Sequence, residues 1–312
     1  MAQTRMRPPP SAAPAAQEAV ATLGRQAGSM AAALRPVGWF LIVAVAGTAL
    51  WEGYKALGRS IGDVIPGLGI ALPVATDDMA MPHVGAILGS LGAPVQRGVD
   101  VSLGSYLVQQ AAVTLQEALA GLVLGLLLGC ALAVLFLLLA PVRRGLLPWV
   151  VASQTVPLVA IAPMVVVWGG QVGMPAALTV AAISAYLAFF PITVNTLRGL
   201  QSPATIQLEL MRSIAASRRQ TLWALRFPAA LPYLFAGMRV AATASVIGAI
   251  VGELSAGTGN GIGRAILNFT YYYSSGPEKL YAAVLVASLA GIVFVQLVNL
   301  AERLALRHRP RG

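Results

Sequence analysis

Long apolar segments dominate the chain, and six of them are long enough to be membrane helices. A helix needs about 20 mostly apolar residues to cross a bilayer. Segments that satisfy this rule lie at about 37–57, 108–139, 147–168, 173–197, 233–255 and 280–301. The pattern therefore predicts an all-α membrane protein with six transmembrane helices, and it places the membrane domain within residues 36–305.

The ends of the chain and the segments between the helices are different in character. Residues 1–35 are rich in Ala, Pro, Gln and Arg, which predicts a disordered arm, and residues 306–312 form a basic tail. The first apolar run starts too far from Met1 for a secretory signal, so we interpret it as a retained helix. Polar connections are expected at 58–105, 198–232 and 256–279, of which 198–232 is basic and amphipathic.

Composition and charge support a membrane protein. The chain has 312 residues, of which 57% are hydrophobic and only 10% are charged, and its mean hydropathy is +0.76. A soluble domain carries about 25% charged residues, so a soluble enzyme is excluded. The net charge of +10 does not indicate a nucleic-acid partner, because so apolar a chain offers no polar basic face of useful size.

The distribution of charge predicts the orientation. With both termini in the cytoplasm, five of the 21 basic residues lie outside, and the other sixteen lie inside. Cytoplasmic loops are the ones enriched in Lys and Arg. Most acidic residues fall on or near the outer side: Glu52, Asp63, Asp77, Asp78, Asp100, Glu253 and Glu278.

The residues needed for several kinds of chemistry are missing. Cys130 is the only cysteine, and His83 and His308 are far apart, so no metal site or catalytic residue is expected. Neither Lys55 nor Lys279 follows a glycine, so there is no phosphate-binding loop of the GxxxxGK type. If the protein uses ATP, another chain must bind it.

The connection at 198–232 carries the strongest signal. Ser202 and Pro203 predict a helix start, with serine as the N-cap. The apolar residues that follow share one helix face: Ile206, Leu210, Met211 and Ile214. A second short helix, 220–225, is expected to end before Pro228. From periodicity alone, the first helix could lie on the membrane surface or contact a partner.

The residues from Glu209 to Pro232 resemble the EAA loop of bacterial ABC importer permeases. Glu209 takes the acidic position, Ala215 stands where the family usually has Gly, and Leu225, Phe227 and Pro228 follow at the family spacing; Leu210 and Met211 replace two alanines. The resemblance implies a type I ABC importer permease fold and a coupling helix that inserts into a separate ATPase subunit. The residues expected to serve this coupling are Glu209, Arg212, Ala215, Ser217, Arg218, Leu225 and Pro228.

The resemblance extends over about 105–305. Segments 157–163, 167–169, 190–200, 251–253, 261–263 and 301–303 are similar to the nitrate, sulfonate, taurine and bicarbonate branch, which includes riboflavin and thiamine-precursor permeases. It implies a bacterial inner-membrane protein that binds no cofactor itself, with ATP and Mg on the ATPase. It also implies two copies around a twofold axis and an extracytoplasmic solute-binding protein.

Candidates for the translocation path come from prolines, aromatic residues and acids within the spans. Proline frees a carbonyl, which survives in a membrane only where protein or water covers it. The candidates are Pro157, Pro163, Trp168, Phe189, Phe190, Pro191, Glu117 and Glu253. Plain kinks for the prolines and interfacial anchoring for the aromatic residues remain open, as does a place for Glu117 at the outer N-terminus of a helix.

Glycines stand out at two places. Gly121, Gly125 and Gly129 repeat every fourth residue on one helix face, which favours close packing of another helix. Gly257, Gly259, Gly261 and Gly263 look like a nucleotide fingerprint but follow no strand, so we expect a flexible outer loop. The adjacent run of Tyr271, Tyr272 and Tyr273 is more typical of an interface anchor than of a partner site.

These observations predict the membrane subunit of an ATP-driven importer, without bond chemistry of its own. The substrate expected from the resemblance is a vitamin or pyrimidine precursor, with sulfonate, taurine, nitrate or bicarbonate as the alternative. Two rivals are a secondary transporter and a membrane scaffold. The first is disfavoured because there is no clear inverted repeat and there are few intramembrane charges, and the second because the helices are broken by proline.

Overall fold

The computed structural model describes residues 38–307 except for 68, 97 and 257–259. The predicted arm, 1–35, and residues 308–312 of the predicted tail lie outside the described residues. The chain divides into two compact units, Met1–Val84 and Gly85–Gly312, each with its own contacts.

The first unit is an apolar helix whose C-terminal end is covered by the chain that follows it. The helix runs Gly38–Ile61, and a short antiparallel hairpin follows, β1 (Val64–Ile65) and β2 (Ile70–Ala71). Residues 74–84 then fold back, so that buried Lys55 donates to Asp78 at 2.6 Å and the Glu52 carboxylate accepts from the Val84 N–H at 2.8 Å. The prediction of an all-α fold missed this hairpin.

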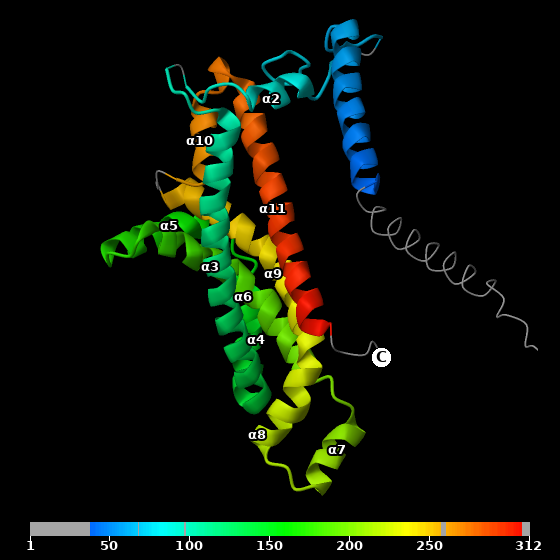
Figure 1. The fold of residues 1–312 in the computed structure, drawn as a ribbon, viewed down its shortest axis with the longest axis vertical. Coiled ribbons are helices and arrows are strands. Elements are labelled where there is room, and N and C mark those ends of the chain that lie inside the picture. The colour runs from blue at the N-terminus through cyan, green and yellow to red at the C-terminus, as the bar shows by residue number, and fades with distance from the viewer. Residues whose placement is uncertain (1–37, 68, 97, 257–259, 308–312) are drawn as a thin grey trace, which may run out of the picture. The chain divides into compact units, whose positions relative to one another are not determined.

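The regular elements in the described part of the second unit are all helices, apart from one isolated bridge between Pro94 and Ser102. Its elements are α2 (Val84–Ser90), α3 (Leu103–Leu138), α4 (Ala140–Ser153), α5 (Leu158–Gln171), α6 (Ala176–Leu200), α7 (Thr205–Ser213), α8 (Arg218–Thr221), the π-helical turn η1 (Leu222–Arg226), α9 (Phe227–Ala256), α10 (Ile262–Tyr271), the 3₁₀ turn η2 (Tyr273–Ser275) and α11 (Pro277–Leu306). Figure 1 shows α3, α6, α9 and α11 running alongside one another, with α10 near one end of this group and α7 and α8 at the other.

Small residues bring α3, α6 and α9 into close contact. A Cβ atom built on Gly125 would lie 2.8 Å from Ala188 Cβ, and one on Gly129 would lie 2.8 Å from Ile192 Cγ2. Gly121 faces Ser184, whose hydroxyl donates to the carbonyl of Ser245 on α9 at 2.7 Å. The every-fourth-residue glycines of α3 therefore lie where α6 approaches most closely.

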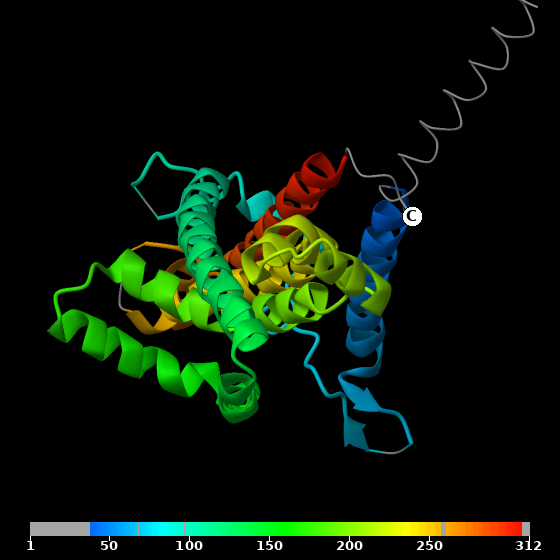
Figure 2. The ribbon, with the colours of Figure 1, turned by 90° about the horizontal axis from the view of Figure 1, so that it is seen from below.

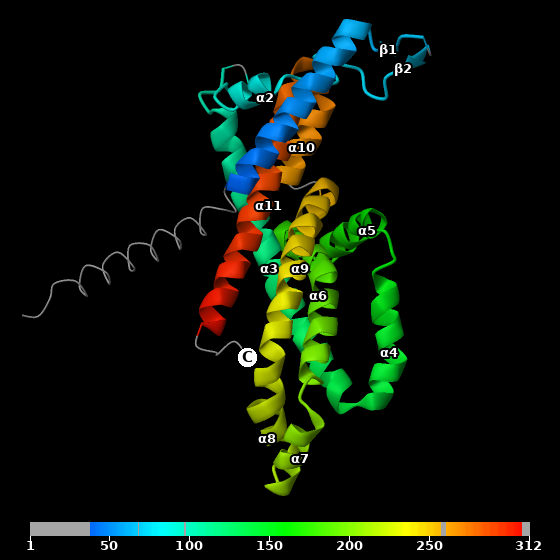
Figure 3. The ribbon, with the colours of Figure 1, turned by 90° about the vertical axis from the view of Figure 1, so that its right-hand side faces the viewer.

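Five helices in the described residues are long and apolar enough to cross a membrane: Gly38–Ile61, α3, α6, the continuous run Arg218–Ala256, and α11. The predicted third span, 147–168, is wrong as one straight helix. The chain there forms α4 and α5, which meet at an angle of 101°. Figures 2 and 3 show α5 extending sideways from the group of long helices, and Figure 3 shows α4 running alongside that group.

Proline explains this bend. Pro157 is the N-cap of α5, and the residue before a proline is pushed out of helical geometry, so the helix of Ser153 cannot continue through it. Each half has 14 residues, about 21 Å of helix, which is less than the ~30 Å of a hydrocarbon core. The hydroxyl of Tyr186 on α6 donates to the Ser153 carbonyl, which holds the end of α4 at the bend.

Candidate functional site

The segment between α6 and α9 forms two short helices, α7 and α8. The first of them, α7, begins two residues later than predicted. The N-cap of α7 is Ala204, and Gln207 Oε1 accepts from the Ala204 N–H at 3.0 Å. Ser202, the predicted N-cap, instead donates from its hydroxyl to the carbonyl of Gly199 at 2.8 Å. The expectation for Ser202 was therefore wrong, because its hydroxyl closes the end of α6 rather than opening α7.

The end of α7 is a turn of Schellman type at Ala215. The Ala215 N–H donates to the Arg212 carbonyl and the Ala216 N–H donates to the Met211 carbonyl, both at 2.9 Å. This turn requires a left-handed residue, and Ala215 has φ +53°. Glycine adopts such a conformation without steric cost, whereas alanine does not. The geometry supplies a physical reason for a glycine at this position.

Ser217 opens α8 through a reciprocal capping box. Its hydroxyl accepts from the Gln220 N–H at 3.2 Å, and its own N–H donates to Gln220 Oε1 at 2.7 Å. Two backbone donors at the start of a helix are satisfied in this way.

The predicted end of the second helix before Pro228 is wrong, because the helix continues into α9. The N–H of Phe227 donates to the carbonyl of Leu222, one residue further back than in an α-helix. This π-turn carries the chain past Leu225 and through Pro228 without a break. Such single π-turns are frequent at functional sites.

The apolar face of α7 is uncovered. Ile206 is 71% exposed, Leu210 is 62% exposed, and Ile214, just after the helix, is 64% exposed. Glu209 lies on the same helix and is also exposed. An uncovered apolar stripe on a nine-residue helix outside the long spans is typical of a contact surface.

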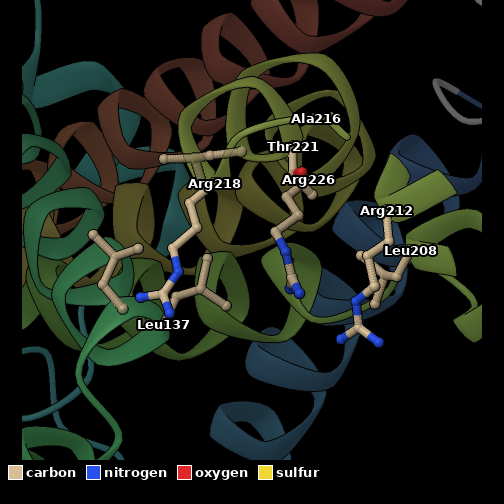
Figure 4. Close-up of a pocket in the computed structure, with 9 residues that line it drawn as sticks. Leu137, Leu208, Arg212, Ala216, Arg218, Thr221 and Arg226 are labelled. Carbon is tan, nitrogen blue, oxygen red and sulfur yellow. The ribbon is translucent and has the colours of Figure 1, made fainter. Parts of the chain in front are cut away.

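A basic pocket of about 550 Å³ lies beside α7 and reaches the end of α3. Figure 4 shows Arg212, Arg218 and Arg226 with their guanidinium groups pointing the same way. Arg226 is fixed by a 2.7 Å hydrogen bond to the Leu200 carbonyl. No ion pair joins these three arginines to an acid within the described residues. The pocket is lined by Leu137, Leu138, Leu208, Arg212, Ala216, Arg218, Thr221, Leu222 and Arg226.

Sequence reasoning missed part of this surface. Arg226 was not singled out, although it follows Arg218 by eight residues, about two helical turns, along the same helical run. Leu137 and Leu138 were seen only as parts of a long apolar span. Their place in the pocket depends on the packing of α3 and could not be read from the local pattern.

The expected path residues lie in three separate places of this chain. Pro157, Pro163 and Trp168 are exposed on α5. Phe189 and Pro191 are buried within α6, and Pro191 packs closely on Gly237 of α9. Phe190 is half-buried beside them, and the pair of Glu117 and Glu253 lies elsewhere, near the start of α10. The described chain therefore does not bring all eight residues into one lining.

The structure contradicts one open alternative and one expectation near α10. Glu117 does not sit at a helix N-terminus, because α3 begins at Leu103, about four turns earlier. Gly261 and Gly263 do not belong to a flexible loop, since both are buried and both N–H groups are hydrogen-bonded. Gly257 and Gly259 lie outside the described residues. Tyr271 and Tyr272, in contrast, are largely exposed at the end of α10.

Known proteins resemble the chain over most of its length. Residues 121–307 match the family of the binding-protein-dependent transport system inner membrane component. The formylaminopyrimidine transport permease protein ThiX of Halalkalibacterium halodurans is 34% identical over 71% of this chain and 86% of its own length. The riboflavin transport system permease protein RibX of Chloroflexus aurantiacus is 33% identical over 53% of this chain and 59% of its own length.

Two further comparisons concern the range of relatives and the fold. The taurine transport system permease protein TauC of Escherichia coli is 28% identical over 67% of this chain and 69% of its own length. A solved amino acid ABC transporter structure aligns with a TM-score of 0.50 at 18% identity, over 64% of this chain and 94% of the other, and so shows the fold. The chain therefore belongs to the family of binding-protein-dependent transport system inner membrane components and is the membrane-spanning permease subunit of an ABC importer.

Proposed function

We propose that two copies of this chain form the translocation path, each with six spans and both termini in the cytoplasm. The bent pair α4 and α5 counts as one span in this arrangement. The sorting of basic residues supports the orientation, because it leaves most of them on the side of α7 and α8. The exposed residues Pro157, Pro163 and Trp168 on α5 would then line the path together with the partner copy.

Coupling to an ATPase subunit is assigned to α7 and the pocket beside it. The single observation that carries this proposal is the uncovered apolar stripe of Ile206, Leu210 and Ile214 next to three arginines that pair with no acid in the part of the chain that the structure describes. A groove in the ATPase with an apolar floor would cover the apolar stripe of α7, and an acidic rim would pair with the three arginines. The tight turn at Ala215 and the capping box at Ser217 hold the two short helices in the shape that such a groove would accept.

The energy for transport would come from that partner. ATP and Mg²⁺ would bind to the ATPase, and this chain would carry out no bond chemistry. An extracytoplasmic binding protein would deliver the solute to the end of the helices opposite α7. Closure of the ATPases would shift the pair of permeases between two states, since a ligand shifts an equilibrium by its difference in affinity for them.

The substrate proposed is a vitamin or pyrimidine precursor. Support comes from the similarity to a formylaminopyrimidine permease and a riboflavin permease. Sulfonate, taurine, nitrate and bicarbonate are the alternative, and the aliphatic sulfonate, taurine and nitrate permeases among the relatives favour it. Reconstituted transporter with its binding protein should hydrolyse ATP faster with the true substrate. If only taurine or nitrate accelerates ATP hydrolysis, the vitamin or pyrimidine precursor is wrong and the alternative substrate class takes its place.

The coupling proposal is tested by a matched pair of substitutions. Ile206→Asp places a charge on the apolar stripe of α7, and Ile70→Asp makes the same change on the exposed strand β2. We expect Ile206→Asp to lose ATPase binding and ATP-dependent uptake in proteoliposomes, while Ile70→Asp retains both. Glu209→Lys should also weaken coupling. Uptake that survives Ile206→Asp, or that proceeds without any ATPase, would overturn the proposal.

A further inference from the structure

Three successive backbone N–H groups at the start of α10 are held by side chains from other helices. The Gly261 N–H donates to Gln110 Oε1 at 2.6 Å, and the Ile262 N–H donates to Thr114 Oγ1 at 2.8 Å. The Gly263 N–H donates to Glu253 Oε2 at 2.6 Å. The first turn of a helix has donors with no partner within the helix, and here α3 and α9 supply the partners.

The chain passes so close to Glu253 that only glycine fits. Gly261 has φ +101°, and a Cβ atom at this position would overlap the Glu253 carboxyl group. A Cβ atom at Gly263 would lie 2.9 Å from Glu253 Oε2. The segment is therefore shaped around this carboxyl group rather than loosely placed over it.

A second carboxyl group completes the cluster. Gln110, Thr114 and Glu117 follow one another along one face of α3, and the carboxyl group of Glu117 lies close enough to that of Glu253 for a hydrogen bond. Glu253 is fully buried and Glu117 is 8% exposed. Each has one oxygen, Glu117 Oε2 and Glu253 Oε1, with no hydrogen-bond partner among the described residues.

No positive charge compensates the pair in the described part of the chain. Neither carboxyl group takes part in an ion pair. Arg264 follows Gly263 on α10 and is partly buried, and α11 contributes the phenol of Tyr281 to the packing around α10. Tyr106, one turn before Gln110 on α3, and Tyr186 on α6 add two further phenols. α9 has no ionisable side chain between Arg239 and Glu253, and α5 has none.

Two carboxylates in contact, buried and without a cation, repel each other strongly, whereas a carboxylic acid and a carboxylate form a strong hydrogen bond. We propose that Glu117 and Glu253 hold one proton between them, and that this proton keeps the first turn of α10 fixed against α3 and α9. The acid hydrogen lies between the two groups, so Glu253 Oε2 stays free to accept from Gly263. These two residues are positioning residues, because they act through α10 and touch no solute.

Loss of the proton would release α10. Two negative charges would then face each other at the point where α3, α9 and α10 meet, and the N–H groups of residues 261–263 would lose partners as the cluster opened. α10 joins α9 to α11 at the end opposite the coupling helices (Figure 1). The pair is therefore a protonation-dependent latch at that end, and it does not depend on which solute is carried.

Infrared spectroscopy of the full-length chain in lipid nanodiscs tests the shared proton directly. The wild type should show a carbonyl band of a protonated carboxyl group at neutral pH, and Glu117→Gln should lose it. Glu278→Gln, which changes an acid in the first turn of α11, should leave the band unchanged. Absence of the band from the wild type overturns the proposal, and this result does not require any variant to fold.

Hydrogen exchange tests the effect on α10. The rate for a peptide covering residues 260–271 is compared between wild type and Glu117→Gln at each pH, so that base-catalysed exchange cancels. We expect equal rates at low pH and, above the titration of the pair, a wild-type excess that grows up to about tenfold per pH unit. If the exchange rates of the wild type and Glu117→Gln keep a constant ratio at every pH, the proposal is overturned. Protection that depends on sodium or potassium concentration instead of pH would also overturn it, since a bound cation would then replace the proton.

Discussion

Replacing Ala215 with glycine should stabilise the turn that ends α7. Ala215 has φ +53°, a left-handed conformation in which the Cβ atom of an L-residue crowds the following carbonyl oxygen. Glycine has no Cβ atom and keeps both hydrogen bonds of the turn, because these are made by the backbone N–H groups of residues 215 and 216. The substitution therefore removes strain and leaves the contacts intact.

The size of the effect follows from two opposing terms. The left-handed conformation costs a non-glycine residue about 1–2 kcal/mol. Glycine costs about 0.4–1 kcal/mol through the greater freedom of the unfolded chain. The central values of the two ranges, about 1.5 and about 0.7 kcal/mol, leave a net gain of about 0.8 kcal/mol, which corresponds to roughly a fourfold shift in the population of the closed turn.

Hydrogen exchange at the amides of Ala215 and Ala216 measures this population. Both N–H groups are hydrogen-bonded at 2.9 Å, so their exchange requires the turn to open. In Ala215→Gly the N–H of residue 216 should exchange about fourfold more slowly. In Ala215→Val, where a β-branched side chain is forced into the same conformation, it should exchange faster.

The opposite order would refute the reasoning. If Ala215→Gly exchanges as fast as the wild type and Ala215→Val is no faster, residue 215 is not held in a left-handed conformation in the membrane. A slower ATPase-coupled uptake in Ala215→Gly, with the expected exchange, would show instead that coupling benefits from a strained turn.

Three further predictions concern packing, pH and capping. Gly125→Val should lower the unfolding free energy in detergent by about 1–3 kcal/mol, because the new Cβ would lie 2.8 Å from Ala188 Cβ. The hydrogen bond from the Lys55 ammonium holds the pKa of Asp78 below its ordinary value. The folded state thus favours the charged form, and its contribution is lost as pH falls below about 4, so hydrogen exchange of residues 74–84 should then accelerate. Ser217→Ala should destabilise the start of α8 by about 1 kcal/mol, measured by exchange at Gln220.

Matched variants distinguish these local effects from a general loss of stability. Gly145→Val on α4 adds the same side chain where no atom lies within 4 Å of its Cβ, and it should keep the wild-type stability. Asp78→Asn should lessen the acid dependence of residues 74–84 and leave the part carried by Glu52, whose carboxylate accepts from the Val84 N–H. An unchanged dependence would contradict the assignment to Asp78. Gln220→Ala removes the other half of the capping box and should weaken α8 as Ser217→Ala does.

The local pattern was sufficient for several features of this protein. Apolar length identified five of the six predicted spans, because a helix must satisfy its own backbone in lipid and so depends little on its neighbours. The spacing around Glu209 identified the family, which the matched region 121–307 confirms. The ends of α7 and α8 were less well predicted, because the polar groups there bind partners three to five residues away, as Ser202 does with the Gly199 carbonyl and the Phe227 N–H with the Leu222 carbonyl.

Tertiary structure alone decided what distant segments do together. The sequence marks Glu117 and Glu253 as acids within the spans but does not pair them, and only the packing of α3, α9 and α10 brings their carboxyl groups close together. The 101° bend between α4 and α5 likewise depends on whether neighbouring helices cover the groups freed at Pro157, as Tyr186 does for the Ser153 carbonyl. A sequence determines which segments can enter a membrane because each segment meets the lipid by itself. The contacts between buried polar groups are set by the whole fold, since each group needs a partner that another helix must bring.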